Sequence, residues 1–280
     1  MAGIVPAVAA TGLPLSLQLR LLRGVAATGW RQMRLRHWAK AHPQIASGRG
    51  WCRRAWWGVA AGGVMQRHLG NPNRRSAALR LLDEPDWTEF DQARAKGGVI
   101  VATAHLGPPK FLMHSLIERR LPLLVWTNAA DLPAWLPATT ETTFLDPLLP
   151  AERGVLMVKS ALHLRRGGVL LGAADMQTGD RSREFDRLGR RWHLSPGLPA
   201  LARQLSVPAF FMLALWEGNR VRISCRRLEP PASDLPEEAW EDAWLDRYWD
   251  EVERVVCTSP ENLRFLRGID AGRFRRELGV

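Results

Sequence analysis

Two segments in the middle of the chain share one hydrophobic pattern, in which paired glycines lead into a continuous apolar run. They read GGVIVATAH from Gly97 and GGVLLGAAD from Gly167, and each follows a helix-like stretch that ends in basic residues. Continuous apolar runs that alternate with helical segments are typical of parallel strands covered by helices on both faces. The pattern predicts an α/β domain over residues 77–280, with a central, mainly parallel sheet flanked by helices. Further strands are expected at 121–126, 207–215 and 219–228.

Residues 1–76 follow a different pattern, and we expect N-terminal amphipathic helices that form a membrane-surface region. After Pro14, arginines lie to one side of a line of apolar residues at steps of three and four. Such a helix can lie on a bilayer or pack against its own domain, and we favour the bilayer. Pro6, Gly12 and Arg20 interrupt the apolar stretch, so no transmembrane helix is expected. The apolar line comprises Leu15, Leu19, Leu22, Ala26, Trp30 and Met33.

Three other segments complete the expected organisation. A second N-terminal helix should precede the loop at 71–73. Residues 128–154 are rich in Pro and Thr and show little periodicity, so a loop that borders a substrate channel is expected there. Near the C-terminus, PEEAWEDAWLDRYWDEVERVV predicts an amphipathic helix, in which Trp240, Trp244 and Tyr248 recur at four-residue steps and face the core.

The composition narrows the partners of the chain. Its 39 Lys and Arg residues against 28 Asp and Glu residues give a formal net charge of +11. This charge attracts anionic lipid headgroups, phosphate-bearing carriers or nucleic acid, but no RNP, KH or helix-turn-helix pattern is present, so we do not expect nucleic acid. The three cysteines show no CxxC spacing, and we expect no metal or other cofactor. The 13 Trp residues suit a membrane interface or an ordinary core equally well.

The candidate chemistry lies where the two glycine-led strands end. His105 follows the first strand and Asp175 follows the second. Ligands of parallel sheets bind beyond the carboxyl ends of the strands, so these two side chains fall where a site is expected. The plainer explanation is a histidine at a strand end and an aspartate that caps its own loop.

The same residues carry a resemblance to a known family. VIVATAHLGPPKFL resembles the strand–His–x4–acid block of bacterial lysophospholipid acyltransferase-like enzymes, especially the lipid A late acyltransferase branch. GVLLGAADMQTGDRSREFDRLGRRWHLSPGLPALARQLSVPAFF resembles a later block of that branch, and SPENLRFLRG resembles its ending. The similarity covers about residues 80–268. It implies the family's α/β fold and a peripheral position at the cytoplasmic face of the inner membrane.

The resemblance also implies an activity. Enzymes of this family move an acyl group from a thioester, on acyl carrier protein or coenzyme A, to a hydroxyl or amine of a lipid-like or carrier-bound acceptor. The family histidine takes the proton of the attacking group, and an acid after it holds the imidazole in the useful tautomer. His105 matches that histidine, and an imidazole is well suited to such proton transfer. The position of the acid holds Lys110, which can donate a hydrogen bond but, when charged, cannot accept one.

Three hypotheses follow from this departure. In the one that we favour, Asp175 replaces the missing acid from the neighbouring strand. In the second, His105 acts alone on a more acidic nucleophile, while Lys110 binds a phosphate or carboxylate of donor or acceptor. In the third, the chain is a catalytically inactive lipid- or carrier-binding protein. The plainer explanation for Lys110 is a side chain that points to solvent.

The remaining candidates are binding residues. The basic loop TGDRSREFDRLGRRWHLSPG precedes a helix start, and both arginines and exposed helix amides bind phosphates of the kind that phosphopantetheine or coenzyme A carries. A solvated basic loop explains the pattern equally well. At 127–128 the chain departs from an arginine that is frequent in the family. The expected substrate-binding residues are Gly107, Lys110, Thr127, Asn128, Arg181, Arg190, Arg191, Ser195 and Gly197.

Overall fold

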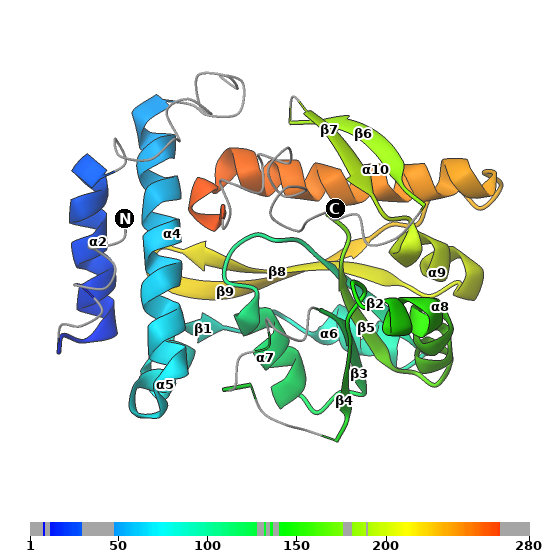
Figure 1. Ribbon diagram of the computed structural model, residues 1–280, viewed down its shortest axis with the longest axis horizontal. Helices are drawn as coiled ribbons and strands as arrows, with labels where there is room; N and C mark the ends of the chain where they lie inside the picture. The colour runs from blue at the N-terminus through cyan, green and yellow to red at the C-terminus, as the bar shows by residue number, and fades with distance from the viewer. Residues whose placement is uncertain are drawn as a thin grey trace.

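A seven-stranded sheet forms the centre of the computed structural model (Figure 1), with strand order β1-β9-β8-β2-β5-β3-β4. β8 and β9 pair antiparallel, and every other neighbouring pair is parallel. The predicted α/β class with a mainly parallel sheet is confirmed. The structure describes residues 8, 12–29, 48–127, 132, 135–136, 140–175, 181–188 and 190–263. The strands are β1 (Leu82–Asp83), β2 (Val99–Thr103), β3 (Leu123–Trp126), β4 (Thr142–Leu145), β5 (Val169–Ala173), β8 (Ala209–Glu217) and β9 (Arg220–Leu228).

The two glycine-led runs become β2 and β5, which are neighbours in the middle of the sheet. Each strand has four fully buried residues before its last position, as expected for a parallel strand with helices on both faces. The close packing of the backbone explains why Gly98 is a glycine, since a β-carbon there would lie 2.2 Å from the carbonyl oxygen of Leu164. The strand therefore begins where another backbone passes too closely for any side chain.

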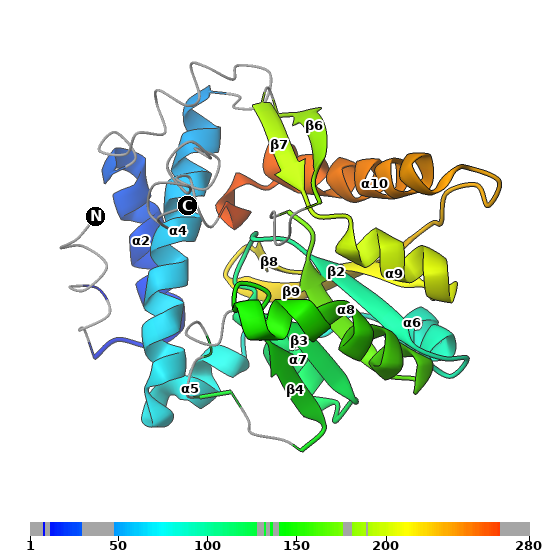
Figure 2. The same cartoon turned by 45° about the vertical axis from the view of Figure 1, so that its right-hand side comes forward.

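Helices cover both faces of this sheet. α10 lies on one side of β8 and β9 and α7 on the other, as Figures 1 and 2 show. α9 packs against both α8 and α10. A two-stranded antiparallel hairpin, β6 (Arg183–Arg187) with β7 (Arg190–Leu194), precedes α9 and packs along α10. The helices are α2 (Leu15–Gly29), α4 (Gly48–Gly70), α5 (Pro72–Leu79), α6 (Thr88–Arg94), α7 (Lys110–Glu118), α8 (Pro150–Arg165), α9 (Gly197–Leu205), α10 (Glu237–Thr258) and the short 3-10 helix η3 (Pro260–Asn262).

The N-terminal helix α2 corrects one expectation. Its line of apolar residues was assigned to a bilayer, but Leu15, Leu19, Leu22 and Ala26 are buried in the core, and α2 packs on α4. The reason is that α4 offers an apolar face of its own, and burying a leucine against protein removes as much surface from water as burying it in lipid. Trp30 and Met33 lie outside the described residues.

α4 in turn joins the N-terminal helices to the α/β domain. Trp57 meets Trp216 of β8 edge-on, with ring centroids 5.3 Å apart. α4 also packs along η3. Within the part of the chain that the structure describes, no helix is long and apolar enough to span a membrane. Buried tryptophans stand at Trp51, Trp56, Trp57, Trp135, Trp216, Trp240, Trp244 and Trp249, so these residues serve the core.

The segment expected to be a loop over 128–154 contains regular structure. β4 forms the edge strand beside β3, and α8 begins at Pro150. The prediction of a loop was wrong for these two stretches because β4 is a short, half-exposed strand whose threonines give no apolar run, although threonine favours strands.

Candidate active site

The register of two parallel strands brings the candidate histidine and acid together. Thr103 at the end of β2 lies opposite Ala173 at the end of β5. His105 and Asp175 each follow two residues later, so both leave the sheet at the same edge. His105 Nδ1 lies 2.8 Å from Asp175 Oδ1, and the backbone N–H of His105 donates to Asp175 Oδ2 at 2.7 Å. The carboxylate thus holds both the ring and the backbone of His105.

This geometry assigns the proton on the imidazole. A carboxylate only accepts hydrogen bonds, so Nδ1 of the neutral ring carries the hydrogen and Nε2 carries the lone pair. The side chain of His105 is 39% exposed, whereas that of Asp175 is 13% exposed. The basic nitrogen therefore belongs to a ring that solvent reaches, while the acid lies behind it.

Tyr248 of α10 is hydrogen-bonded to the end of β2, close to His105. Its hydroxyl donates to the carbonyl oxygen of Thr103 at 2.9 Å, and its ring stacks parallel to Trp244 at 6.1 Å. Burial, together with the negative charge of Asp175, raises the pKa of Tyr248 well above its usual value, so the hydroxyl stays a donor. The sequence pattern placed this tyrosine in the core but missed its hydrogen bond. The signal was available, because a buried tyrosine hydroxyl usually finds a partner.

The turn that follows His105 is held by the backbone. Leu106 N–H donates to the carbonyl of Ala104 at 2.7 Å, and Gly107 N–H donates to the carbonyl of Asn262 at 2.5 Å. Gly107 has φ +58°, and a β-carbon there would lie 1.9 Å from the carbonyl oxygen of Ala214. Only glycine fits this position. The sequence hypothesis made Gly107 a binding residue, but its N–H is engaged by the protein, so its established contribution is to the turn.

Lys110 opens α7 where the family places an acid. Its side chain is buried, with 8% of the residue exposed, so the plainer explanation of a lysine that points to solvent is wrong. A lysine is seldom buried to this extent. Its suggested role in binding a phosphate or carboxylate stays a prediction.

The other predicted binding residues along this edge are placed in part. Thr127 follows β3, is half-buried, and donates its N–H to the carbonyl of Leu145 at 3.0 Å. Since β3 pairs with β5, Thr127 stands at the same edge of the sheet as Asp175. Asn128 lies outside the described residues.

The start of α9 holds two further candidates. Ser195 is half-buried and stands two residues before the helix begins. Gly197 is its first residue, and a β-carbon at Gly197 would touch the ring of Trp126 at 3.4 Å. This is an ordinary van der Waals distance, so the packing of α9 against β3 does not itself require glycine here. Their suggested part in anion binding stays a prediction.

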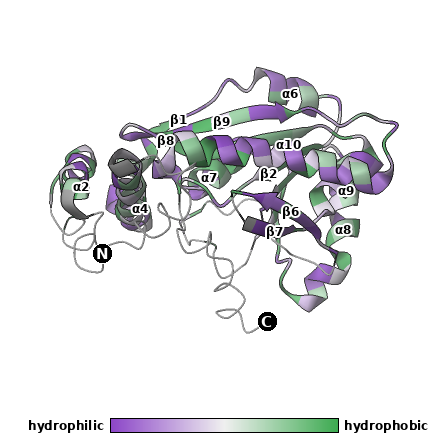
Figure 3. Cartoon of the chain, turned by 90° about the horizontal axis from the view of Figure 1, so that it is seen from above, coloured by the Kyte–Doolittle hydropathy of each residue, from purple (hydrophilic) through white to green (hydrophobic). Residues whose placement is uncertain are grey.

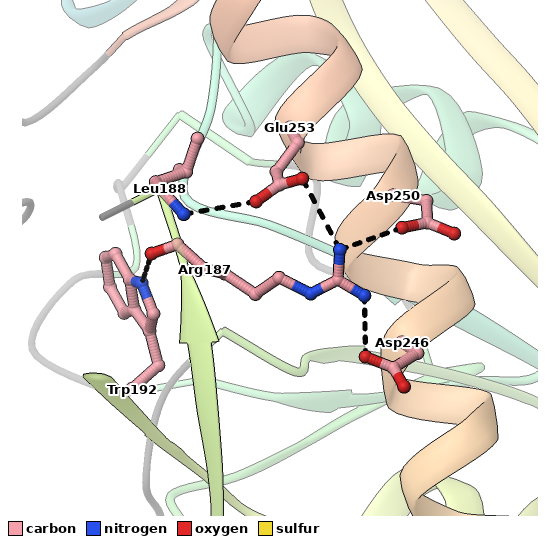
Figure 4. A network of polar contacts seen from close by, with 6 residues as sticks. All are labelled: Arg187, Leu188, Trp192, Asp246, Asp250 and Glu253. Carbon is pink, nitrogen blue, oxygen red and sulfur yellow. Dashed lines mark hydrogen bonds and ion pairs between the residues drawn. The ribbon is translucent and has the colours of Figure 1, made fainter. Parts of the chain in front are cut away.

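Arg181, Arg183 and Arg187 of the basic loop contact carboxylates of α10, and Figure 3 shows the hairpin of β6 and β7 as strongly hydrophilic. Arg187 of β6 reaches three carboxylates on one side of α10 (Figure 4): Asp246 at 2.6 Å, Asp250 at 3.1 Å and Glu253 at 3.5 Å. The hydrogen bond to Asp246 is the main cause that raises the pKa of Arg187 above its usual value. Glu253 also accepts the backbone N–H of Leu188 at 3.1 Å. The hairpin is thereby fastened to α10.

The predicted phosphate-binding arginines take part in similar contacts. Arg181 lies 3.4 Å from the fully buried carboxylate of Glu241. Arg191 lies 3.2 Å from Asp186 within the hairpin. The side chain of Arg190 lies outside the described residues. The structure thus gives Arg181 and Arg191 carboxylate partners that the sequence hypothesis did not include, and anion binding by them stays a prediction.

A cavity of about 200 Å³ lies beside the turn that follows His105. It is bordered by α4, the turn, the end of β8 and η3 and is partly open to solvent. Gly62 of α4 borders it, and a β-carbon at Gly62 would meet no atom within 4 Å. The lining is mainly apolar and includes Val59, Gly62, Met65, Gly107, Pro108, Phe111, Trp216 and Asn262. Sequence reasoning missed the contributions of α4 and η3, because neither belongs to a recognised motif of the histidine block.

Comparison with known proteins adds one distant relative. No protein-family model matches the chain. The Vi polysaccharide export protein VexE of Salmonella typhi is 25% identical over 236 residues. The match covers 81% of this chain and 35% of VexE. The chain therefore spans little more than a third of that protein, and the similarity shows relatedness at a distance.

Proposed function

We propose that the chain is a thioester-dependent acyltransferase with His105 as its general base. The observation that carries the proposal is the contact of His105 Nδ1 with Asp175 Oδ1 at 2.8 Å. It provides an acid–histidine pair despite the lysine at the position of the family acid, and such pairs are the usual means of activating a nucleophile for acyl transfer. We therefore carry forward the hypothesis in which Asp175 replaces the missing acid.

In the proposed reaction, Nε2 of His105 takes the proton of an acceptor hydroxyl or amine while that group attacks the thioester carbonyl carbon. A bond forms between the acceptor and this carbon, and the carbonyl oxygen carries the negative charge. When the tetrahedral intermediate collapses, the carbon–sulfur bond breaks and the thiolate takes the proton back from Nε2. Asp175 stays a carboxylate and balances the charge of the imidazolium through Nδ1.

The cavity beside the turn supports an acyl substrate. It is lined mainly by apolar side chains. One of its lining residues, Gly107, stands two residues after His105 in the sequence. An apolar cavity of roughly 150 Å³ takes up benzene, so about 200 Å³ has room for a short segment of an alkyl chain. The proposed donors are acyl carrier protein and coenzyme A thioesters, both of which present such a chain.

The acceptor is proposed from chemistry and from the distant relative. A lipid-like or carrier-bound hydroxyl or amine suits the proposed base. VexE is named as a polysaccharide export protein, and polysaccharides are rich in hydroxyl groups. We therefore propose saccharide hydroxyls as the first acceptors to be tested.

The alternative function is binding without turnover. The lysine at the position of the family acid favours it, because a chain that had lost catalysis could retain the cavity and the fold. Incubation with acyl carrier protein or coenzyme A thioesters and candidate acceptors, followed by mass spectrometry, separates the two functions. We expect an acylated product with the wild-type chain and none with His105→Ala. Retained turnover in His105→Ala, or tight binding with no product from any thioester, would overturn the proposed activity.

We also propose peripheral attachment to an anionic bilayer at the cytoplasmic face of the inner membrane. Support comes from the outward face of α8, where Val155, Val158 and Leu162 are exposed beside the exposed Lys159. α2 likewise exposes Leu17 and Leu21, and Leu13 is exposed just before the helix begins. Apolar side chains flanked by basic ones bind the surface of anionic membranes.

The attachment is tested with vesicles that contain anionic lipid. Val158→Asp should reduce cosedimentation severalfold, since a carboxylate would enter the apolar layer and be repelled by the headgroups. Ser233→Asp, which adds the same charge at an exposed loop position, is the control. Equal binding of both variants would contradict the attachment through α8.

A further inference from the structure

Asn262 of η3 fixes three segments that meet beside the candidate active site. Its side-chain oxygen Oδ1 accepts the backbone N–H of Trp216 at 2.6 Å, and Nδ2 lies 3.5 Å from the carbonyl oxygen of Trp216. Its own backbone carbonyl accepts the N–H of Gly107 at 2.5 Å. The residue is 1% exposed. A buried amide that is bonded at both ends ties the end of β8 to the turn after His105.

The contact between η3 and the turn continues for one more residue. Leu106 and Leu263 form an isolated antiparallel bridge. On the other side of His105, Asp175 holds both the ring and the backbone N–H. His105 is therefore anchored by β5 before the turn and by the residues 262–263 after it.

η3 is itself pressed against α4. A β-carbon at Gly58 would lie 1.7 Å from the carbonyl oxygen of Glu261, so only glycine allows the two backbones to approach this closely. The end of β8 lies on the opposite side, where Asn262 is bonded to Trp216. η3 consequently has little freedom to move while these contacts persist.

We infer that Asn262 is a positioning residue, which holds the turn after His105 so that the imidazole keeps its orientation toward Asp175. The inference deepens the proposed function and rests on the role of His105 as the base. Asn262 is not proposed to touch the reacting atoms. It acts through the Gly107 N–H and the Leu106 bridge. A catalytic base that is displaced by about 1 Å can lower the rate about a hundredfold.

The test compares two variants that each remove a buried carboxamide. Asn262→Ala removes the two side-chain bonds between η3 and the end of β8. Gln18→Ala removes the fully buried amide that links α2 to His68 of α4, away from the turn. With a thioester donor, Asn262→Ala should lower kcat by about 10- to 100-fold. KM should change as well, because Asn262 also lines the cavity proposed for the acyl chain. Gln18→Ala should leave kcat unchanged. Asn262→Asp keeps the oxygen that accepts from Trp216 but replaces the Nδ2 donor by an oxygen that faces the Trp216 carbonyl, so it should retain more of kcat than Asn262→Ala does.

A second readout does not depend on turnover. In the protein labelled with ¹⁵N at histidine, the signal of the hydrogen on Nδ1 of His105 is identified by its loss in His105→Gln. We expect this signal in the wild type, in Gln18→Ala and in Asn262→Asp, and its loss or broadening in Asn262→Ala. An unchanged signal and an unchanged kcat in folded Asn262→Ala would overturn the inference, and so would loss of both in Asn262→Asp.

The two readouts also separate this inference from the proposed function. If no thioester is turned over by the wild-type chain but the Asn262→Ala signal is lost, the positioning contact stands and the proposed activity fails. If the wild type is active and Asn262→Ala matches it in both measurements, the activity stands and the positioning role fails.

Discussion

Two polar networks of this protein are built from similar charged groups but are arranged in opposite ways. At the carboxyl edge of the sheet, His105 meets the carboxylate of Asp175, and its side chain is 39% exposed. On the hairpin, Arg187 meets three carboxylates of α10, and its side chain is 24% exposed. In the first network a carboxylate contacts one nitrogen of an imidazole, whereas in the second three carboxylates contact the two terminal nitrogens of a guanidinium.

The difference separates a group that can exchange a proton from one that cannot. A guanidinium stays charged at every ordinary pH, so carboxylates around Arg187 fix structure without offering acid–base chemistry. An imidazole can exchange a proton near neutral pH, and a carboxylate that accepts from Nδ1 sets the tautomer in which Nε2 carries the lone pair. A charged side chain near the sheet can therefore either exchange protons or only stabilise the fold. Which role is available depends on the type of group and on its partners.

The largest effect is expected when the acid of the first network is altered. In Asp175→Asn the amide can donate to Nδ1, which favours the tautomer with the hydrogen on Nε2 and removes the base. We expect kcat to fall by about a hundredfold or more. Steady-state rates of Asp175→Asn, His105→Ala and the double variant test this. The double variant should be no slower than His105→Ala, and additive losses would mean that the two residues act separately.

A smaller effect is expected when the second network is broken. Arg187→Leu leaves three carboxylates near one another without their cation, but all of them are partly exposed and screened. We expect a loss of about 1 kcal/mol in the free energy of unfolding, or roughly 2–4 °C in Tm, with kcat unchanged. Thermal unfolding and steady-state rates measure both.

Arg191→Leu is the matched control for the hairpin. Arg191 belongs to the same hairpin, but its side chain is 62% exposed, and its partners lie within the hairpin itself. Its removal should change Tm less than Arg187→Leu does. If Arg187→Leu lowers kcat at an unchanged Tm, the hairpin takes part in substrate binding, and the division between the two networks fails.

The smallest effect is expected at His68, which compares with His105 because its partner is a neutral amide and not a carboxylate. His68 of α4 is buried, and its Nε2 lies 3.2 Å from Oε1 of Gln18 on α2. Burial, with a lesser contribution from Arg74, lowers the pKa of His68 below its usual 6.5. The unfolded chain therefore binds a proton at His68 more readily than the folded one does, so stability falls as the pH drops below about 6.5 toward the lowered folded value.

Denaturant unfolding between pH 7.5 and pH 5 tests this expectation. His68→Leu should flatten the part of the pH dependence that lies below 6.5 and leave the stability slope near pH 7.5 unchanged. His193→Gln alters an exposed histidine of the hairpin and is the control. An identical pH dependence in wild type and His68→Leu would show that the α2–α4 contact does not discriminate against the protonated ring.

The sheet and the central pair could be predicted because they depend on short-range pattern. Paired glycines and apolar runs defined β2 and β5, and parallel strands carry their polar successors to one edge. These two features alone predict that Asp175 faces His105, and the contact of their side chains confirms it. The catalytic role of the pair remains a prediction, since no observation of turnover bears on it.

What could not be predicted depends on partners that are distant in the sequence. The apolar line of α2 has the same periodicity whether it meets lipid or α4, so the pattern alone could not decide. Arg187 contacts carboxylates about 60 residues further along the chain, on α10. The sequence pattern of that helix predicted its apolar face but not these contacts. Asn262 reaches Gly107 across most of the domain, and no local motif announces that contact.

β2 and β5 have the same number of residues between their first paired position and the candidate active-site residue, and this limits which insertions and deletions the chain can tolerate. His105 stands six residues after Val99, Asp175 stands six residues after Val169, and Val99 is paired with Val169. Successive side chains of a strand point to opposite faces. A single inserted or deleted residue inside either strand would turn one member of the pair away from the other. Length variation among descendants of this sequence is thus expected only in the connections, while β2 and β5 keep the same count.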